Sequence, residues 1–202
     1  EGAPLYATKA VDPIIINAGD GAHEHPTQAL LDMYSILEHK PTLEGLKVVI
    51  IGDIMHSRVA RSNIYGLTKM GADVHLAGPR TMVYPELEKL GVTVHHDIRE
   101  AVVDADVVNV LRIQLERIHS ALYPTNREYA RIFGINKSVL ENAKDDVLVL
   151  HPGPMNRGLE IAPDVAYGDA SVIQEQVRNG VAIRMAILYL TIIGGDGSEL
   201  AD

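Results

Sequence analysis

The chain has no cysteine, no long hydrophobic run and fewer basic than acidic residues. Without cysteine it can form neither disulfides nor a zinc–cysteine site. Its apolar runs, such as Val147–Leu150, are far shorter than the roughly 20 residues of a membrane-spanning helix. Its 18 basic and 27 acidic residues give a net charge of −9, which argues against a nucleic-acid-binding protein. Because no signal-peptide pattern is found either, we expect a cytoplasmic protein without membrane or nucleic-acid partners.

Length and composition fit one large domain or two small ones. The 202 residues are 47% hydrophobic and 22% charged, as in ordinary globular proteins. The chain begins at Glu1 without methionine, and its first strand-like run comes only at Pro13–Asn17. We therefore expect it to be part of a longer protein.

Short β-rich runs alternate with helical patterns along most of the sequence. The runs predict strands over Ile14–Asn17, Lys47–Gly52, Val74–Ala77, Val92–His95, Asp106–Leu111 and Val147–Leu150. The patterns between them predict helices over Pro26–His39, Ser57–Met70, Pro85–Leu90, Ile98–Val103, Thr125–Phe133 and Lys137–Ala143. This alternation predicts an α/β fold with a doubly wound parallel sheet, in which ligands bind beyond the carboxyl ends of the strands.

A long helix is expected over about Ser171–Ile193, with a broad apolar face. It could be a core helix of the same domain, or it could pack on a second domain that is mostly absent here.

The segment His25-Pro26-Thr27-Gln28 puts a histidine and a glutamine at the start of a predicted helix. Proline suits the first helical position because its missing N–H needs no partner there. The free amides and partial positive charge of a helix start favour an anionic or polarised carbonyl ligand.

Two loops that follow predicted strands carry arginines. Arg58 lies near the start of a helix, where it could bind a carboxylate or be an ordinary surface arginine. Arg112 and Gln114 share one face of an extended segment and could grip a planar carboxylate, with Glu116 orienting Arg112. The same three residues could instead form ordinary salt bridges of a loop.

A third loop, His151-Pro152-Gly153-Pro154, forms a rigid turn whose backbone carbonyls can face a ligand. His151 could be structural or catalytic. No G-x-G-x-x-G, H-E-x-x-H or G-x-S-x-G pattern occurs, which argues against a dinucleotide, a catalytic metal and serine hydrolase chemistry. We expect no metal and no cofactor.

Four motifs together resemble the aspartate carbamoyltransferases of the aspartate/ornithine carbamoyltransferase superfamily. They are His25-Pro26-Thr27-Gln28, Gly52-Asp53-x4-Arg58, Arg112-x-Gln114-x-Glu116-Arg117 and His151-Pro152-Gly153-Pro154-x-Asn156-Arg157-Gly158. They occur in the family's order and cover nearly the whole chain. Ornithine carbamoyltransferases typically have H-C-L-P in the last motif, so Pro152 favours aspartate as the acceptor.

The resemblance implies transfer of a carbamoyl group from carbamoyl phosphate to L-aspartate, in pyrimidine biosynthesis. His25 would donate to the carbamoyl carbonyl oxygen, and Gln28 and the backbone at Pro152 and Gly153 would hold the carbamoyl amide. Arg58, Arg112 and Gln114 would bind aspartate, with Asp53 and Glu116 supporting them. The resemblance also implies a homotrimer, with regulatory or other pathway subunits as further partners.

The same resemblance divides the chain into three parts. Residues 1–41 would be a remnant of a carbamoyl-phosphate-binding domain, 42–168 the Rossmann-like aspartate-binding domain, and 169–202 a helix that returns to the first domain. The family's S-T-R-T phosphate motif and its lysine loop are not found in the sequence. Two alternatives stay open: a carbamoyltransferase for ornithine or another acceptor, and a catalytically dead binding module of the same fold.

We expect the 202-residue chain alone to show no measurable carbamoyl transfer. The reason is that without the phosphate motif the leaving group is not held, and little of the positioning contribution to catalysis survives. Turnover by the purified chain at a rate near that of an intact relative would contradict this expectation.

Overall fold

The computed structural model describes residues 1–114 and 123–193. In chain order, the elements of these ranges are α1 (Ala3–Ala10), α2 (Pro26–Leu37), β1 (Lys47–Ile51), α3 (Arg58–Lys69), β2 (Asp73–Ala77), the 3₁₀ helix η1 (Pro85–Leu90), β3 (Thr93–His95), α4 (Ile98–Ala101), β4 (Val107–Val110), α5 (Asn126–Phe133), α6 (Lys137–Leu140), β5 (Leu148–Leu150), α7 (Pro163–Ala166) and α8 (Ile173–Ile193).

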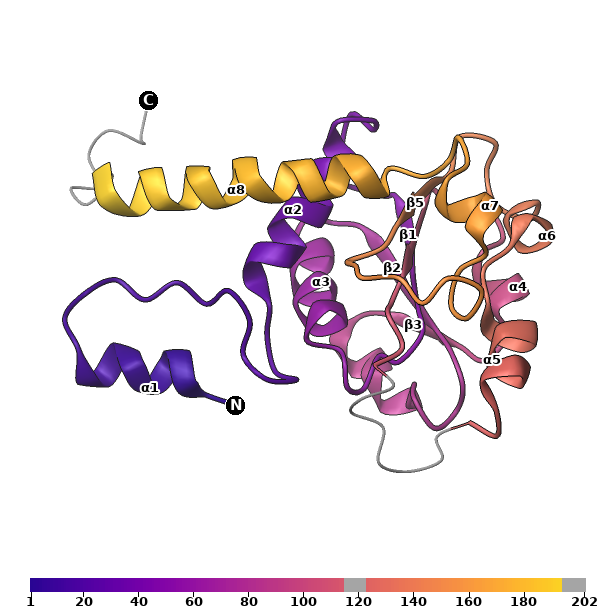
Figure 1. The fold of residues 1–202 in the computed structure, drawn as a ribbon, viewed down its shortest axis with the longest axis horizontal. Coiled ribbons are helices and arrows are strands. Elements are labelled where there is room, and N and C mark those ends of the chain that lie inside the picture. The colour runs from indigo at the N-terminus through magenta and orange to yellow at the C-terminus, as the bar shows by residue number, and fades with distance from the viewer. Residues whose placement is uncertain (115–122, 194–202) are drawn as a thin grey trace.

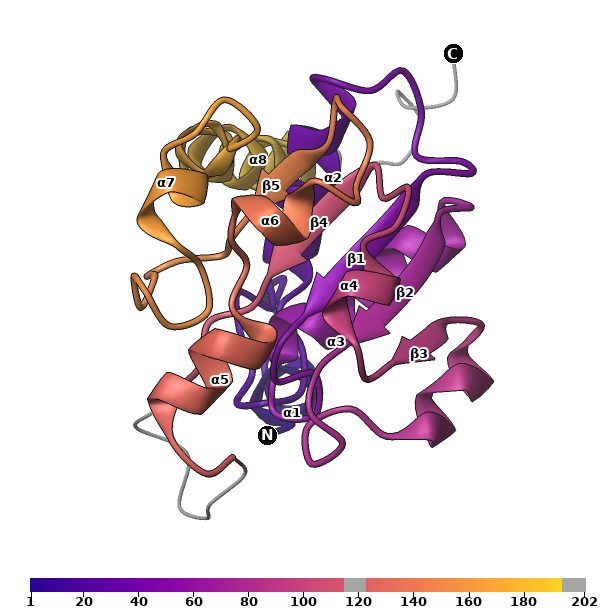
Figure 2. The same ribbon diagram turned by 90° about the vertical axis from the view of Figure 1, so that its right-hand side faces the viewer.

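The strands form one parallel sheet in the order β3-β2-β1-β4-β5 (Figure 2). The chain builds outward from β1 to β3, then crosses back to add β4 and β5 on the other side of β1. The direction of winding therefore reverses between β1 and β4, where Val48 pairs with Val107 and Ile51 with Val110. A reversal of this kind opens a crevice at the carboxyl ends of the two strands.

Helices cover both faces of the sheet, as the continuous apolar strands predicted. On one face the core joins β1 to α2 and α3 through Val48, Ile50, Ile36, Ile64 and Leu67. On the opposite face it joins β1 to α4, α6 and α7 through Val49, Ile51, Ala101, Val139 and Val165. The prediction of a doubly wound α/β fold is confirmed.

Three local predictions differ from the structure. The strand expected over Ile14–Asn17 is wrong: the segment lies outside the sheet with Ile14 exposed, because no described strand runs beside it to pair with. Pro85–Leu90 is a 3₁₀ helix rather than an α-helix. Helices α1 and α7 were not predicted. The amphipathic pattern that predicts a helix comes from a buried apolar face, and α1 buries no residue.

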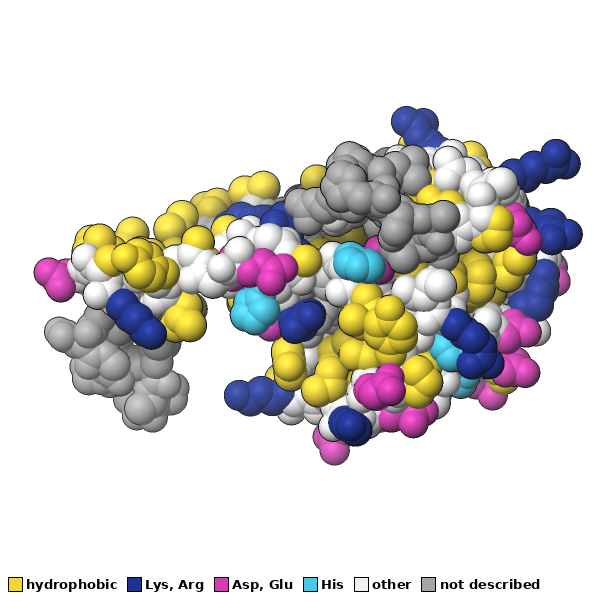
Figure 3. Space-filling model, turned by 90° about the horizontal axis from the view of Figure 1, so that it is seen from below, with side chains coloured by type: hydrophobic (Ala, Val, Ile, Leu, Met, Phe, Trp, Pro, Cys, Tyr) yellow, Lys and Arg dark blue, Asp and Glu magenta, His cyan; other side chains and the backbone are white. Residues whose placement is uncertain are grey.

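Helix α8 packs against α2 along its first half and then projects beyond the sheet (Figure 1). Its buried residues, Ile173, Gln176, Asn179 and Gly180, all lie in that first half. Large hydrophobic side chains stay exposed further along, and Figure 3 shows such side chains gathered on the projecting arm that contains α1 and α8. The first half of α8 is thus a core helix of this domain.

A buried carboxylate, Asp32 of α2, joins four elements of the fold. It is 0% exposed, and its oxygens accept hydrogen bonds from Gln28 Nε2 (2.8 Å), Gln176 Nε2 (2.6 Å), Asn63 Nδ2 (2.7 Å) and Asn109 Nδ2 (3.4 Å). These side chains come from α2, α8, α3 and β4. We refer to these five residues as the Asp32 cluster.

Burial raises the pKa of Asp32 to about 6, and the four amide donors act in the opposite direction. Since this carboxyl group binds its proton more tightly in the folded than in the unfolded chain, its contribution to stability is largest at low pH. That contribution falls as the pH rises from about 4 to about 6.

Replacing Asp32 with alanine should destabilise the protein severely. The change leaves several buried amides without their acceptor, and each such group costs about 1–3 kcal/mol. We expect urea unfolding to show a loss of at least about 3 kcal/mol, against less than about 1 kcal/mol for Leu30→Ala on the exposed side of the same helix. Equal stability of the two variants would contradict the role of Asp32.

Candidate active site

A cavity of about 200 Å³ lies at the switch point, over the carboxyl ends of β1, β4 and β5. It is lined by His25, Gln28, Ser57, Arg58, Val59, Arg112, Gln114, Pro152, Gly153 and Pro154. All seven residues that the sequence analysis assigned to substrate contacts are in this set. The structure therefore brings together side chains from four separate segments of the chain.

His25 is the residue that precedes the first turn of α2. Its N–H donates to Ser62 Oγ at 2.9 Å, and its Nδ1 lies 3.3 Å from Thr27 Oγ1. When the Thr27 hydroxyl donates to Nδ1, a neutral imidazole carries its proton on Nε2, where it can serve a ligand as a donor.

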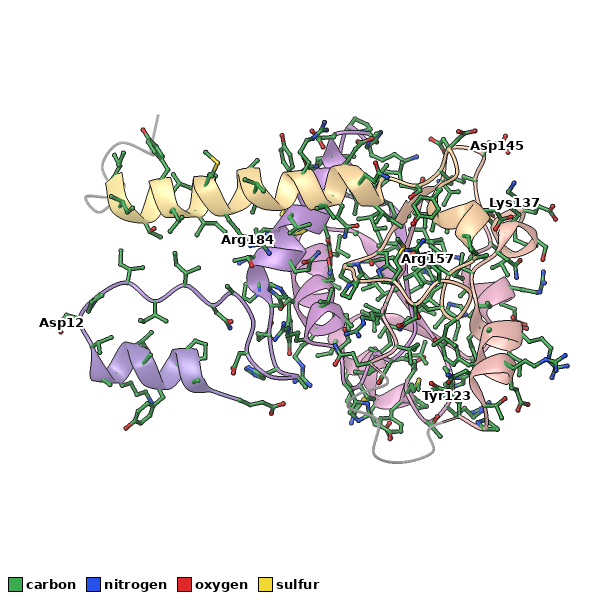
Figure 4. All side chains as sticks on the ribbon, viewed as in Figure 1. Asp12, Tyr123, Lys137, Asp145, Arg157 and Arg184 are labelled. Carbon is green, nitrogen blue, oxygen red and sulfur yellow. The ribbon has the colours of Figure 1, made fainter. Side chains whose placement is uncertain are left out.

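The pKa of His25 is lowered to about 4. Burial is the largest cause, followed by the positive charges of Arg58 and Arg184. Figure 4 shows Arg184 below α8 and beside α2. The imidazole is therefore neutral at pH 7 and can act as a hydrogen-bond donor without carrying charge.

Arg58 is the first residue of α3, after Ser57, whose Oγ accepts a hydrogen bond from the N–H of Ala60 at 3.1 Å. The Arg58 guanidinium lies against Gly19, which has a φ of +134°. A Cβ at residue 19 would come within 2.9 Å of the guanidinium carbon. Gly19 is thus needed for both its backbone conformation and the space it leaves to Arg58.

Arg112 and Gln114 follow β4 and both line the cavity, while the side chain of Ile113 between them is buried in the core. This agrees with the predicted alternation along an extended segment. Gln114 Oε1 is buried and has no hydrogen-bond partner among the described residues. Glu116, which was expected to orient Arg112, lies outside the described residues.

Gln28 lines the cavity, and its Nε2 donates to Asp32. With the nitrogen committed in this way, the oxygen of the amide is the atom available to accept a hydrogen bond from a ligand. The Gly153 N–H donates to Nδ1 of His151 at 2.9 Å, and the His151 side chain is 0% exposed. His151 does not line the cavity, which favours a structural role for it.

Asp53 also lies outside the cavity lining. Its carboxylate accepts hydrogen bonds from the N–H of His56 (3.2 Å) and from His56 Nδ1 (2.9 Å), which shapes the loop leading to Arg58. Ser57, Val59 and Pro154 line the cavity but were not predicted to do so. Ser57 could have been predicted from the sequence, because it directly precedes a helix that follows a central strand.

A larger hollow of about 390 Å³ lies beside α7 and the start of α8. Glu175 is the one charged side chain in its lining, so it does not suit an anionic ligand. Within residues 1–114 and 123–193, no three histidine or acidic residues cluster in a way that could hold a metal ion. No helix in those ranges is both long and apolar enough to span a membrane.

The doubly wound fold and the arginines at its switch point define an α/β protein with a positively charged cavity at the carboxyl ends of its central strands. Comparisons with known proteins identify its family. Residues 44–191 match the family model "Aspartate/ornithine carbamoyltransferase, Asp/Orn binding domain", and residues 3–38 match the corresponding "carbamoyl-P binding domain". The chain belongs to the aspartate/ornithine carbamoyltransferase family.

Individual relatives agree with this assignment. The aspartate carbamoyltransferase catalytic subunit of Ruminiclostridium cellulolyticum is 60% identical over 201 residues, which cover 100% of this chain and 64% of that protein. The aspartate transcarbamoylase of Trypanosoma cruzi, solved with aspartate and phosphate, is 29% identical with a TM-score of 0.77, covering 93% of this chain and 60% of that one.

The ornithine carbamoyltransferase of Pyrococcus furiosus is 32% identical with a TM-score of 0.72, covering 84% of this chain and 56% of that one. The chain thus spans less than two thirds of the length of the relatives it matches.

The imidazole of His25 should titrate at about pH 4 in the 202-residue protein, followed by NMR of its ring C–H signals. The His25→Gln variant lacks this imidazole, so the ring C–H signal that is missing from its spectrum belongs to His25. Arg58→Gln removes the second cause of the shift and should raise the pKa, although burial keeps it below 6.5. Because the unfolded chain binds the proton more readily, His25 should also reduce stability as the pH falls from about 6.5 to about 4. Titration of His25 near 6.5 would overturn the argument.

Proposed function

We propose that this chain is part of an aspartate carbamoyltransferase, which transfers the carbamoyl group of carbamoyl phosphate to the amine of L-aspartate and releases phosphate. The observation that supports this most is the cavity that holds a neutral imidazole beside two arginines and two amides. The relatives named aspartate carbamoyltransferase catalytic subunit support the same assignment.

In the proposed reaction the aspartate amine attacks the carbamoyl carbon, and the carbonyl oxygen becomes a tetrahedral oxyanion. His25 Nε2–H would donate to that oxygen, and the amide oxygen of Gln28 would accept from the carbamoyl nitrogen. Collapse of the intermediate breaks the bond to phosphate. Donors that are already in place where charge develops lower the barrier without reorganisation.

The charge of the cavity lining favours aspartate over ornithine as the acceptor. Arg58 and Arg112 could each pair with one carboxylate of aspartate, and Gln114 adds an amide. Among the described residues, none that lines the cavity is acidic. The positively charged side chain of ornithine would therefore find two guanidinium groups there, and no carboxylate from the described part of the chain.

The proposal extends to the domains, the assembly and the location. Residues 1–41 would belong to a carbamoyl-phosphate-binding domain, 42–168 would form the aspartate-binding domain, and 169–202 would return to the first domain. The two family models, which match residues 3–38 and 44–191, support the first boundary, whereas the second rests on the family resemblance. The family resemblance supports a homotrimer and a role in pyrimidine biosynthesis, and the acidic, moderately hydrophobic composition supports a cytoplasmic location.

The test uses a completed protein, in which residues 1–202 are joined to the part of the R. cellulolyticum catalytic subunit that this chain does not cover. It should form N-carbamoyl-L-aspartate and should not use ornithine. Absence of turnover with either acceptor would favour the alternative of a catalytically dead binding module.

In the completed protein, Arg112→Lys should raise the KM for aspartate at least tenfold, much as Arg112→Ala does. Lysine lacks the planar fork that binds a carboxylate through two hydrogen bonds. Breaking a desolvated charge pair costs about 2–5 kcal/mol, which is more than a factor of ten. Steady-state kinetics for both substrates measure the effect, and the KM for carbamoyl phosphate should change little.

Arg131→Lys, on the exposed surface of α5, is the matched control and should leave both KM values unchanged. An Arg112→Lys enzyme with the unchanged KM for aspartate would remove Arg112 from the proposed aspartate site.

A further inference from the structure

Behind the cavity, a series of hydrogen bonds connects the Asp32 cluster to the arginine-bearing segment after β4. Gln176, which donates to Asp32, accepts from the N–H of His151 through its Oε1 at 3.0 Å. His151 Nε2 lies 3.2 Å from Glu160 Oε1, which also accepts from the N–H of Asn156. We call Gln176, His151, Glu160 and Asn156 the buried relay.

The geometry of the relay defines the tautomer of His151. Its Nδ1 accepts from the N–H of Gly153, so its ring proton is on Nε2 and points to Glu160. His151 and Glu160 are each 1% exposed, which fixes both side chains in a single arrangement. Glu160 thus holds the ring and the backbone of Asn156 at the same time.

The relay ends at the backbone of Ile113. Asn156 Nδ2 donates to the Ile113 carbonyl oxygen at 2.8 Å. The last hydrogen bond to the neighbouring strand before this point is from the N–H of Leu111 to the carbonyl of Ile51, at 2.8 Å. After Leu111 the chain leaves the sheet, and the hydrogen bond from the Asn156 side chain holds the chain at Ile113.

Ile113 is the residue between Arg112 and Gln114. Its side chain is 0% exposed in the core, while its two neighbours line the cavity. Fixing Ile113 by its side chain and its carbonyl therefore fixes the directions in which Arg112 and Gln114 project. Asn156 does not line the cavity, so it can affect a ligand there only through the residues it holds, and its side chain holds the segment of Arg112 and Gln114.

We propose that Asn156 is a positioning residue for the acceptor substrate, held by Glu160 and His151 and acting through the carbonyl of Ile113. The proposal rests on the proposed function where it names aspartate as that substrate. The relay also reaches Gly153 and, through Gln176 and Asp32, Gln28. It thereby links three of the segments that line the cavity.

The first experiment measures both KM values of the completed protein after substitution of Asn156. In Asn156→Ala and Asn156→Asp the side chain cannot donate to Ile113, and we expect the KM for aspartate to rise roughly five- to fiftyfold, since small displacements of positioning groups cost up to about a hundredfold. The KM for carbamoyl phosphate should change less than about twofold. Full activity of Asn156→Asp would overturn the proposal, because aspartate at this position keeps the size but loses the donor.

Two controls separate positioning from stability. Asn136→Ala removes the side chain that accepts from the N–H of Val139 at the start of α6, so it should lower the melting temperature without raising the KM for aspartate. Glu160→Gln keeps the acceptor oxygen for His151 and Asn156 and should preserve the KM, whereas Glu160→Met should raise it as Asn156→Ala does. The proposal would be wrong if the KM for aspartate rises in every variant whose melting temperature falls.

The second experiment does not depend on the reaction and uses the 202-residue protein. Hydrogen exchange should become at least about tenfold faster in the peptide covering residues 111–114 in Asn156→Ala, and should stay unchanged there in Asn136→Ala. Faster exchange in the 202-residue Asn156→Ala variant, together with no transfer to aspartate by the completed protein, would support the positioning role of Asn156 and contradict the proposed function. Unchanged exchange at residues 111–114 would overturn the positioning itself.

Discussion

The Asp32 carboxylate accepts hydrogen bonds from α2, α3, β4 and α8, and the geometry of the cavity depends on this arrangement. Helix α2 presents His25 and Gln28, α3 presents Arg58, and β4 leads to Arg112. A carboxylate surrounded by amide donors in a dry interior tolerates little displacement, since each lost hydrogen bond leaves a buried polar group unpaired. The hydrophobic core alone would allow these helices to slide, whereas the shared acceptor fixes their register.

The sheet topology provides the second constraint. Because winding reverses between β1 and β4, the loops after these two strands diverge to opposite sides and leave a crevice between them. Arg58 follows β1, and Arg112 follows β4, so the two guanidinium groups face one cavity from two sides. Two separate positive groups in one cavity suit a ligand with two anionic ends. The start of α2 closes the third side with the neutral imidazole of His25.

The sequence predicted the sheet well because β1 and β5 are apolar and buried almost throughout, as in a sheet covered on both faces, and because strand-like runs alternate with helical patterns. It failed at Ile14–Asn17, where an equally apolar run has no described partner strand. It also predicted seven of the ten residues that line the cavity, because strand ends and helix starts can be located locally and because the motifs there resemble those of a known family. It missed the Asp32 cluster and the buried relay. Gln176 and Asp32 are 144 residues apart in the chain, and no local pattern indicates that a polar residue in an amphipathic helix meets such a distant partner.

Electrostatics explains why an acidic protein can hold an anion in this cavity. The net charge of −9 repels anionic substrates at long range, but salt screens that field over about 8 Å, so the local charges decide binding. Among the described residues of the lining, Arg58 and Arg112 carry positive charge and none is a carboxylate. Burial, followed by the positive charges of Arg58 and Arg184, lowers the pKa of His25 and keeps its imidazole neutral at pH 7. In the proposed reaction, different groups would therefore recognise the charge of the substrate and donate to the carbonyl oxygen. A protonated His25 would add positive charge to a cavity that already contains two guanidinium groups. It would also give up the neutral form of the imidazole, in which Nδ1 accepts from Thr27 while Nε2–H can be directed at the carbonyl of the proposed substrate.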